Sequence, residues 1–310
     1  MYGEIAAILT VMSFALAFVL ARRIENDFTP IFQNAIKSII GFFTFFVITL
    51  ILGALFNLVI LPINVIIMLI LSITFTVILG DTTLLHTQRI LGPTKALAIA
   101  NTSPFFTFIF AAVFLGRSVT IQMVISGILI GVGVIIITKR ENSNEHEFEK
   151  DLIQEKTKNT RKTTKGVLLG LFVSISLAIG MSLSEYSIGQ TNQILGLGIL
   201  STMLAMVVRF FFALIVLSSV VIIKREKTVI SKSRSSWGIL ILSGILSYTF
   251  GSILFGEAVH IVGASFMSLI SAAMPLFTIP FSYIINKEKL SRRGFLGVSI
   301  TIIGVLLILF

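Results

Sequence analysis

Residues 94–107 have the sequence TKALAIANTSPFFT, and residues 265–278 have the sequence SFMSLISAAMPLFT. Aligning Pro104 with Pro275 defines a shift of 171 residues (275 − 104), which needs no gap from residue 80 onward. The same shift aligns further identical residues: Gly80 with Gly251, Ile90 with Ile261, Gly92 with Gly263, Ile99 with Ile270, Phe106 with Phe277, Thr107 with Thr278, Phe110 with Phe281, Gly133 with Gly304 and Val134 with Val305. Because the chain contains only six Pro, matched Gly and Pro in one frame indicate an internal repeat.

Composition places this repeat in a membrane protein. Of the 310 residues, 55% are hydrophobic and 12% are charged, whereas a soluble domain carries roughly 25% charged residues. The net charge of +10 does not indicate nucleic-acid binding, because the cations lie in short loops between apolar runs. Cys is absent and only three His are present, so we expect no disulfide, no metal site and no cofactor.

The apolar runs are continuous and long enough to predict membrane-spanning helices rather than barrel strands. A charged segment, residues 139–165, separates a first unit of five spans (1–138) from a second unit of five spans (166–310). We interpret the Phe-rich runs at 42–46 and 210–212 as lipid-facing bulk. The ten predicted spans lie near residues 4–21, 31–53, 62–86, 91–115, 119–138, 166–188, 196–223, 236–258, 263–286 and 293–310.

An odd number of spans in each unit has a consequence for topology. The second unit must enter the membrane with the orientation opposite to the first, which makes an inverted repeat. Inverted repeats are typical of secondary transporters, in which two similar units rock around a central site. The predicted fold class is therefore an all-α membrane protein with ten transmembrane helices in two inverted five-helix repeats.

The distribution of basic residues predicts the orientation. Of the 24 Lys and Arg, 20 lie in the odd-numbered loops, and Arg117 alone lies in an even-numbered loop. Cytoplasmic loops are enriched in Lys and Arg. We therefore expect a multi-pass protein of the cell membrane with the 139–165 linker in the cytoplasm and both termini outside.

The repeat also resembles a known family. The segment 94–107, a short polar turn and then Gly127–Gly133 resemble the end of an EamA domain, and Ala264–Thr278 with Gly297–Gly304 resemble it again. Two such domains in tandem are similar to the drug/metabolite transporter superfamily. The resemblance implies export or exchange of small metabolites, amino acids or drugs, with spans 1, 3, 4, 6, 8 and 9 lining the site. Family members often carry Glu in the turn after the fourth helix of each unit. In this chain the second unit has Glu288 at that place, whereas the first unit has Arg117.

Ionisable residues inside a membrane are costly, so each is a functional hypothesis. Lys37 and Arg209 lie at nearly corresponding places in the two units (209 − 37 = 172). They are predicted to bind an anionic group of the substrate; the alternative is a structural cation or one that reaches the interface. Pro104 and Pro275 break their helices, and the polar residues beside them are predicted to line a cavity, the alternative being a packing kink. Those residues are Asn101, Ser103, Ser268 and Ser271, with Thr102 beside them.

Four titratable residues are candidates for proton coupling: Asp81, His86, Glu185 and Glu257. His86 and Glu257 occupy equivalent places in the two units (257 − 86 = 171). The alternative is that these residues sit in water at the interface, or that Lys95 pairs with Asp81 or Glu257 in a structural role.

The expected function is secondary transport of small organic solutes by alternating access, with amino acids among the candidates and protons as a candidate coupling ion. An intramembrane enzyme is an alternative, but the sequence carries no recognisable nucleophile, metal or phosphate-loop motif. A channel is a second alternative, although two inverted halves do not produce rings of one residue type. The expected partners are the solute, the lipid bilayer and protons, with the chain as a monomer or homodimer and without nucleic acid.

Overall fold

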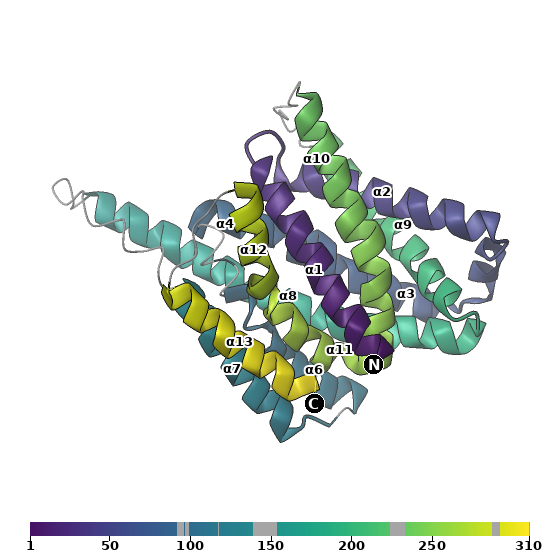
Figure 1. Cartoon of the computed structure of the whole chain (residues 1–310). Coiled ribbons are helices and arrows are strands. Elements are labelled where there is room, and N and C mark those ends of the chain that lie inside the picture. The colour runs from purple at the N-terminus through teal and green to yellow at the C-terminus, as the bar shows by residue number, and fades with distance from the viewer. Residues whose placement is uncertain are drawn as a thin grey trace.

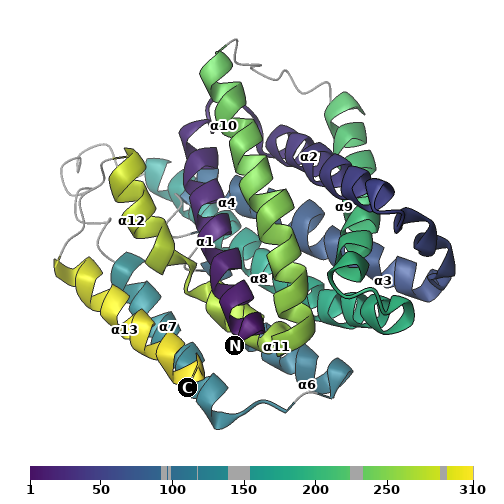
Figure 2. The ribbon, with the colours of Figure 1, turned by 45° about the vertical axis from the view of Figure 1, so that its right-hand side comes forward.

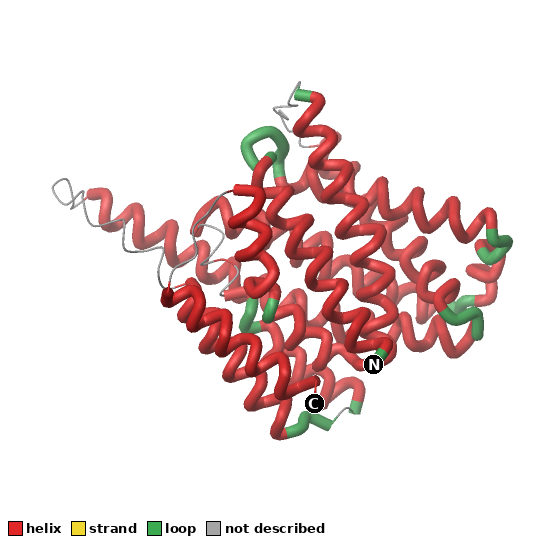
Figure 3. The backbone as a smooth tube through the Cα atoms, viewed as in Figure 1, coloured by secondary structure: helices red, strands yellow, loops and turns green. Residues whose placement is uncertain are grey.

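The structure is a computed structural model of the chain, and it describes residues 1–91, 96, 99–116, 118–138, 154–223, 233–286 and 292–309. These ranges are helical with short turns and contain no β-strand (Figure 3). Six helical runs are long and apolar enough to cross a membrane: Tyr2–Arg23, Pro30–Ile51, Ile63–Gln88, Thr164–Leu195, Ile199–Ile223 and Arg234–Ala272. The all-α membrane class predicted from the sequence is therefore confirmed.

The first unit contains three long runs followed by shorter helices (Figure 1). The predicted fourth span is interrupted, because a turn at Asn101 and Thr102 precedes α6. Lys95 and Arg117 lie outside the described residues. The elements are α1 (Tyr2–Arg23), α2 (Pro30–Ile51), the 3-10 helix η1 (Leu55–Ile60), α3 (Ile63–Ile73), the π-helix η2 (Thr74–Asp81), α4 (Thr82–Leu91), α6 (Ser103–Leu115) and α7 (Ile121–Thr138).

The second unit begins inside the segment predicted to be a linker. Residues 139–153 lie outside the described residues, whereas 154–165 form the first part of α8. Glu288 also lies outside the described residues. The elements are α8 (Gln154–Leu195), α9 (Ile199–Ile223), α10 (Arg234–Gly244), the π-helix η4 (Ile245–Gly251), α11 (Ser252–Ala272), α12 (Met274–Asn286) and α13 (Arg292–Leu309).

Gly263 separates the predicted eighth and ninth spans. Its φ of 84° and ψ of 163° interrupt the helical backbone inside α11. Positive φ at this value is open to glycine and strained for residues with a side chain. The predicted ninth span is interrupted again at Ala273, before α12.

The two units contain matching irregularities. The π-helix η2 begins at Thr74 and the π-helix η4 begins at Ile245, again 171 residues later (245 − 74). A Cβ built on Gly80 would lie 2.9 Å from Leu177 of α8, and one built on Gly251 would lie 2.6 Å from Phe14 of α1. The first helix of each unit therefore packs against the third helical run of the other unit at equivalent glycines.

Two helix pairs join the units. Helix α2 packs along α9, and α7 packs along α13, as Figures 1 and 2 both show. Between α2 and α9 the rings of Phe45 and Phe210 stack with centroids 6.1 Å apart, and both side chains are buried. The interpretation of the Phe-rich runs as lipid-facing is wrong for these two residues, which fill the interface between the units. It holds for Phe43 and Phe211, which are exposed on the outer surface.

The α7–α13 pair depends on close backbone approach at Gly133. A Cβ at Gly133 would lie 2.7 Å from the carbonyl oxygen of Gly297 and 2.8 Å from the backbone nitrogen of Thr301. Backbone atoms cannot move aside as a flexible side chain can. Small residues at helix interfaces in membranes permit this kind of contact.

We predict that Gly133→Ala lowers the free energy of unfolding by about 1–3 kcal/mol, the usual cost of overpacking. Gly131→Ala is the matched control, because it lies on the same helix and a Cβ there meets nothing within 4 Å. Thermal unfolding of the purified variants in detergent measures the difference. Equal melting temperatures for the two variants would show that the α7–α13 contact is not close at Gly133.

Candidate functional site

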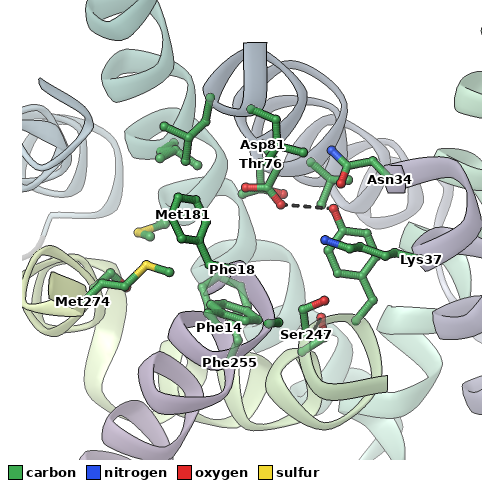
Figure 4. A pocket seen from close by; sticks show the side chains of 18 of the residues that line it. Phe14, Phe18, Asn34, Lys37, Thr76, Asp81, Met181, Ser247, Phe255 and Met274 are labelled. Atoms are coloured by element: carbon green, nitrogen blue, oxygen red, sulfur yellow. Dashed lines mark hydrogen bonds between the residues drawn. The ribbon is translucent and has the colours of Figure 1, made fainter. Parts of the chain in front are cut away.

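A cavity of about 190 Å³ lies between helices of both units. This volume is well above the ~10–15 Å³ that a single water needs on the same measure, and it suits a small solute. One wall is apolar and contains Phe14, Phe18, Met181, Phe255 and Met274 (Figure 4). The polar side chains that line it are Asn34, Lys37, Thr76, Asp81, Asn101, Ser103, Arg209, Ser247, Tyr248, Ser252 and Ser271.

Lys37, Asp81 and Tyr248 form one polar group in the cavity. The Tyr248 hydroxyl donates a hydrogen bond to Asp81 Oδ2 at 3.1 Å, and Lys37 Nζ lies 5.9 Å from the centroid of the Tyr248 ring. Lys37 and Asp81 also interact electrostatically, and their charged ends point toward one another in Figure 4. The Asp81 carboxylate therefore has a nearby cation and a hydrogen-bond donor before any solute binds.

Arg209 stands apart from this group. Its side chain is 3% exposed, its Nη2 donates to Thr76 Oγ1 at 3.3 Å, and its Cζ lies 5.7 Å from the centroid of the Phe255 ring. Its Nε and Nη1 atoms are buried without an acceptor in the described part of the chain. A buried guanidinium normally satisfies its donors, so the free donors of Arg209 mark a place where an acceptor can bind.

Irregular backbone surrounds the cavity on both sides. Thr76 and Asp81 project from η2, and Ser247 and Tyr248 project from η4. A π-helix widens one turn and redirects the side chains that follow, and such turns are common at functional sites. Non-helical backbone at membrane depth is tolerated where it lines a cavity or is buried in protein.

The interruption before Pro104 has a hydrogen-bond partner on a helix of the other unit. Ser174 Oγ of α8 donates to the carbonyl of Ile99 at 2.7 Å and approaches the carbonyl of Ala100 at 3.4 Å. Pro104 is an early residue of α6 and Pro275 is an early residue of α12. The first break is thus satisfied by a hydroxyl, as in a packing kink, while Asn101 and Ser103 beside it still line the cavity.

Six of the predicted site residues lie together around this cavity: Lys37, Asp81, Asn101, Ser103, Arg209 and Ser271. Four other predicted residues are not among its lining residues. Ser268 is buried and donates to the carbonyl of Ser265 at 2.8 Å. His86 is exposed on α4. Glu257 is buried and accepts a hydrogen bond from the Thr202 hydroxyl.

Glu185 is the fourth residue, and it contacts the interruption at Gly263. Its Oε2 accepts a hydrogen bond from the backbone nitrogen of Ala264 at 2.7 Å. A carboxylate in this position stabilises the start of the helical segment that follows. Glu185 also lines a wider cavity of about 760 Å³, together with His260 and residues near Gly116 and Gly196.

Sequence reasoning missed several lining residues, of which Tyr248 is the most important. It followed helix breaks and side chains that are charged or titrate near neutral pH, and Tyr248 is neither. The repeat carries the signal that could have found it, because Tyr248 is equivalent to Val77 at the shift of 171 and both line the cavity. Thr76 and Ser247 form a second equivalent pair of lining residues.

Comparison with known proteins gives one family and one fold. The chain matches the EamA-like transporter family over residues 1–139 and 164–310. A solved structure described only as "Crystal structure of protein" superposes with a TM-score of 0.74 at 14% sequence identity, covering 99% of this chain and 95% of that chain. At this identity the likeness shows the fold alone. No curated protein matches the chain.

We predict that Lys37→Met and Asp81→Asn each lower stability, because each removes the nearby opposite charge from the other residue inside the cavity. The double variant should lose less than the sum of the two single losses, with a coupling energy of about 1 kcal/mol or more. Melting temperatures in detergent measure all three. Lys37→Met combined with Glu257→Gln is the control cycle and should be additive. Additive losses in the Lys37–Asp81 cycle would refute the interaction.

Proposed function

Because the chain belongs to the EamA-like transporter family, we propose that it is a secondary transporter that moves small organic solutes across the cell membrane by alternating access. Amino acids are among the candidate solutes. The observation that carries the proposal is a cavity lined by polar and ionisable residues from both units, in the middle of a bundle of apolar helices.

The proposed topology has ten spans in two inverted units of five. Six long helical runs supply six of the spans, and the shorter apolar helices Ser103–Leu115, Ile121–Gly133 and Met274–Ile285 belong to three more. The tenth is α13. Support for equivalence of the units comes from the π-helices η2 and η4 and from the contacts at Gly80 and Gly251. Equivalent units with an odd number of spans have opposite orientations, which gives two packings of similar energy.

A channel remains the alternative from a different functional class. A transporter binds its solute and changes conformation in each cycle, so solute inside a vesicle can drive uphill entry of labelled solute. A channel allows solutes to equilibrate and produces no such transient. An enzyme is the weaker alternative, because the family to which the chain belongs is one of transporters.

We predict transient accumulation of labelled solute in proteoliposomes that are preloaded with a high concentration of the same solute. A mixture of small labelled metabolites provides the first screen. Ser271→Trp should abolish accumulation, because the indole fills the cavity. Val113→Trp is the matched control, since Val113 is 70% exposed on the outer surface of α6. Equilibration without accumulation, or equal activity of both variants, would contradict the proposal.

Asp81 is the proposed coupling residue. Among the described residues that line the cavity it is the one carboxylate, and it shares that space with Lys37. A proton taken up by Asp81 would change the net charge of the cavity without moving a helix. Outside this cavity, Glu185 accepts a hydrogen bond from the Ala264 amide and Glu257 accepts one from the Thr202 hydroxyl. These bonds favour structural roles for both residues.

We predict that Asp81→Asn abolishes the acceleration of solute flux by an imposed pH gradient but leaves measurable counterflow. Glu257→Gln and Glu185→Gln are the controls, and each should keep the response to the pH gradient. Flux into proteoliposomes with and without the gradient measures the effect. If all three amide variants respond like the wild type, solute exchange or facilitated diffusion replaces proton coupling.

A further inference from the structure

The charged residues of the cavity do not balance. Its described lining residues include two cations, Lys37 and Arg209, and one carboxylate, Asp81. Asp81 interacts with Lys37 and accepts the hydrogen bond of Tyr248. One positive charge is left over, and it belongs to Arg209.

The guanidinium of Arg209 is fixed on one side and has free hydrogen-bond donors on the other. Thr76 and the face of Phe255 fix one side of the guanidinium, while Nε and Nη1 have no acceptor within the described residues. No carboxylate of the described residues lies within salt-bridge distance of Arg209 or of Lys37, but Lys37 lies beside the hydrogen-bonded pair of Asp81 and Tyr248, whereas Arg209 does not. An isolated buried charge is strongly disfavoured unless it is paired, and the guanidinium fork matches a carboxylate in two parallel hydrogen bonds.

A second unpartnered donor lines the same cavity. The Nδ2 atom of Asn101 is buried without an acceptor. It comes from the helix break of the first unit, whereas Arg209 comes from the second unit. A solute with several hydrogen-bond acceptors would satisfy donors of both units if it bound between them.

On these observations we infer that the cavity selects small solutes with one net negative charge carried by a carboxylate, which binds Arg209. The inference rests on the proposed transport function and narrows its substrate class. The apolar wall formed by Phe14, Phe18 and Phe255 accommodates a short hydrocarbon part of the solute.

Other charge classes fit less well. A zwitterion adds no net charge, and its ammonium would compete with Lys37 and Tyr248 for Asp81. A phosphate monoester carries about −1.5 to −2 charges at neutral pH, which exceeds the single unbalanced charge. An amine would add a cation to a cavity that already has an excess of one.

The test uses proteoliposomes loaded with an equimolar set of small solutes matched in carbon skeleton: monocarboxylates, amino acids, neutral amides, amines and phosphate monoesters. Mass spectrometry measures which solutes exchange with an isotopically labelled external set. We expect monocarboxylates to exchange about tenfold faster or more than their zwitterionic counterparts. Both carry a carboxylate, but the ammonium of a zwitterion leaves the extra positive charge of the cavity unbalanced. Equal or faster exchange of zwitterionic, neutral or cationic solutes would overturn the inference and leave the transport function standing.

Variants of Arg209 identify the residue responsible. Arg209→Met should remove the preference for monocarboxylates, whereas Arg209→Lys should keep the preference with slower exchange, because it retains the charge but not the fork. Arg234→Gln removes an exposed cation at the start of α10 and should keep the wild-type preference. A monocarboxylate preference that survives in Arg209→Met would overturn the assignment.

Binding is measured separately from transport, by the rise in melting temperature of the purified protein with each solute. We expect monocarboxylates to stabilise the wild type and Arg234→Gln but not Arg209→Met. Stabilisation without exchange of any solute would support the anion site and count against the transport function. The absence of stabilisation by every monocarboxylate, together with exchange of another class, would reject the anion site alone.

Discussion

Backbone hydrogen bonding inside the bilayer is the constraint on which this structure depends. A peptide group in hydrocarbon has no water to bind, so the chain stays helical wherever it faces lipid. Three departures from regular helix, in η2, in η4 and in the turn at Asn101 and Thr102, contribute residues that line the same cavity, whereas the interruption at Gly263 is not among its lining residues. Hydroxyls such as that of Ser174 take over part of the lost bonding. The cavity therefore lies where irregular backbone can find hydrogen-bond partners within the protein.

Burial of charge is the second constraint, and it separates two kinds of ionisable residue. Lys37 and Tyr248 are buried and Asp81 is half-buried, and the three side chains compensate one another in the absence of solute. Glu185 and Glu257 are likewise occupied by the Ala264 amide and the Thr202 hydroxyl. Arg209 is different, because a hydroxyl and an aromatic face do not neutralise a guanidinium. A solute that accepts hydrogen bonds from Arg209 and neutralises its charge would gain binding energy from doing so.

The repeat made much of this arrangement predictable. The shift of 171 residues located both helix breaks, and the intramembrane positions of Lys37 and Arg209 predicted a pair of cations that binds an anionic group. Asp81 was predicted separately, as a candidate for proton coupling, and the structure places it in the same cavity. Which way a side chain faces was harder to predict. Residues five apart on an α-helix point about 140° apart around its axis, so His86 on α4 is exposed although Asp81 lines the cavity. Tyr248 was not predicted to line the site, because it is neither charged at neutral pH nor a helix breaker.

Accessibility of a single cysteine from the two sides of the membrane tests the central claim most directly. The chain has no native Cys, so Ser103→Cys places one thiol in the cavity. In oriented vesicles, a membrane-impermeant thiol reagent should label it from outside and, in separate samples, from inside, and an exchanged solute should slow both reactions. Val59→Cys, at a position 89% exposed on η1, should react from the outside alone and without protection. Labelling of Ser103→Cys from neither side, or from one side only, would contradict alternating access to this cavity.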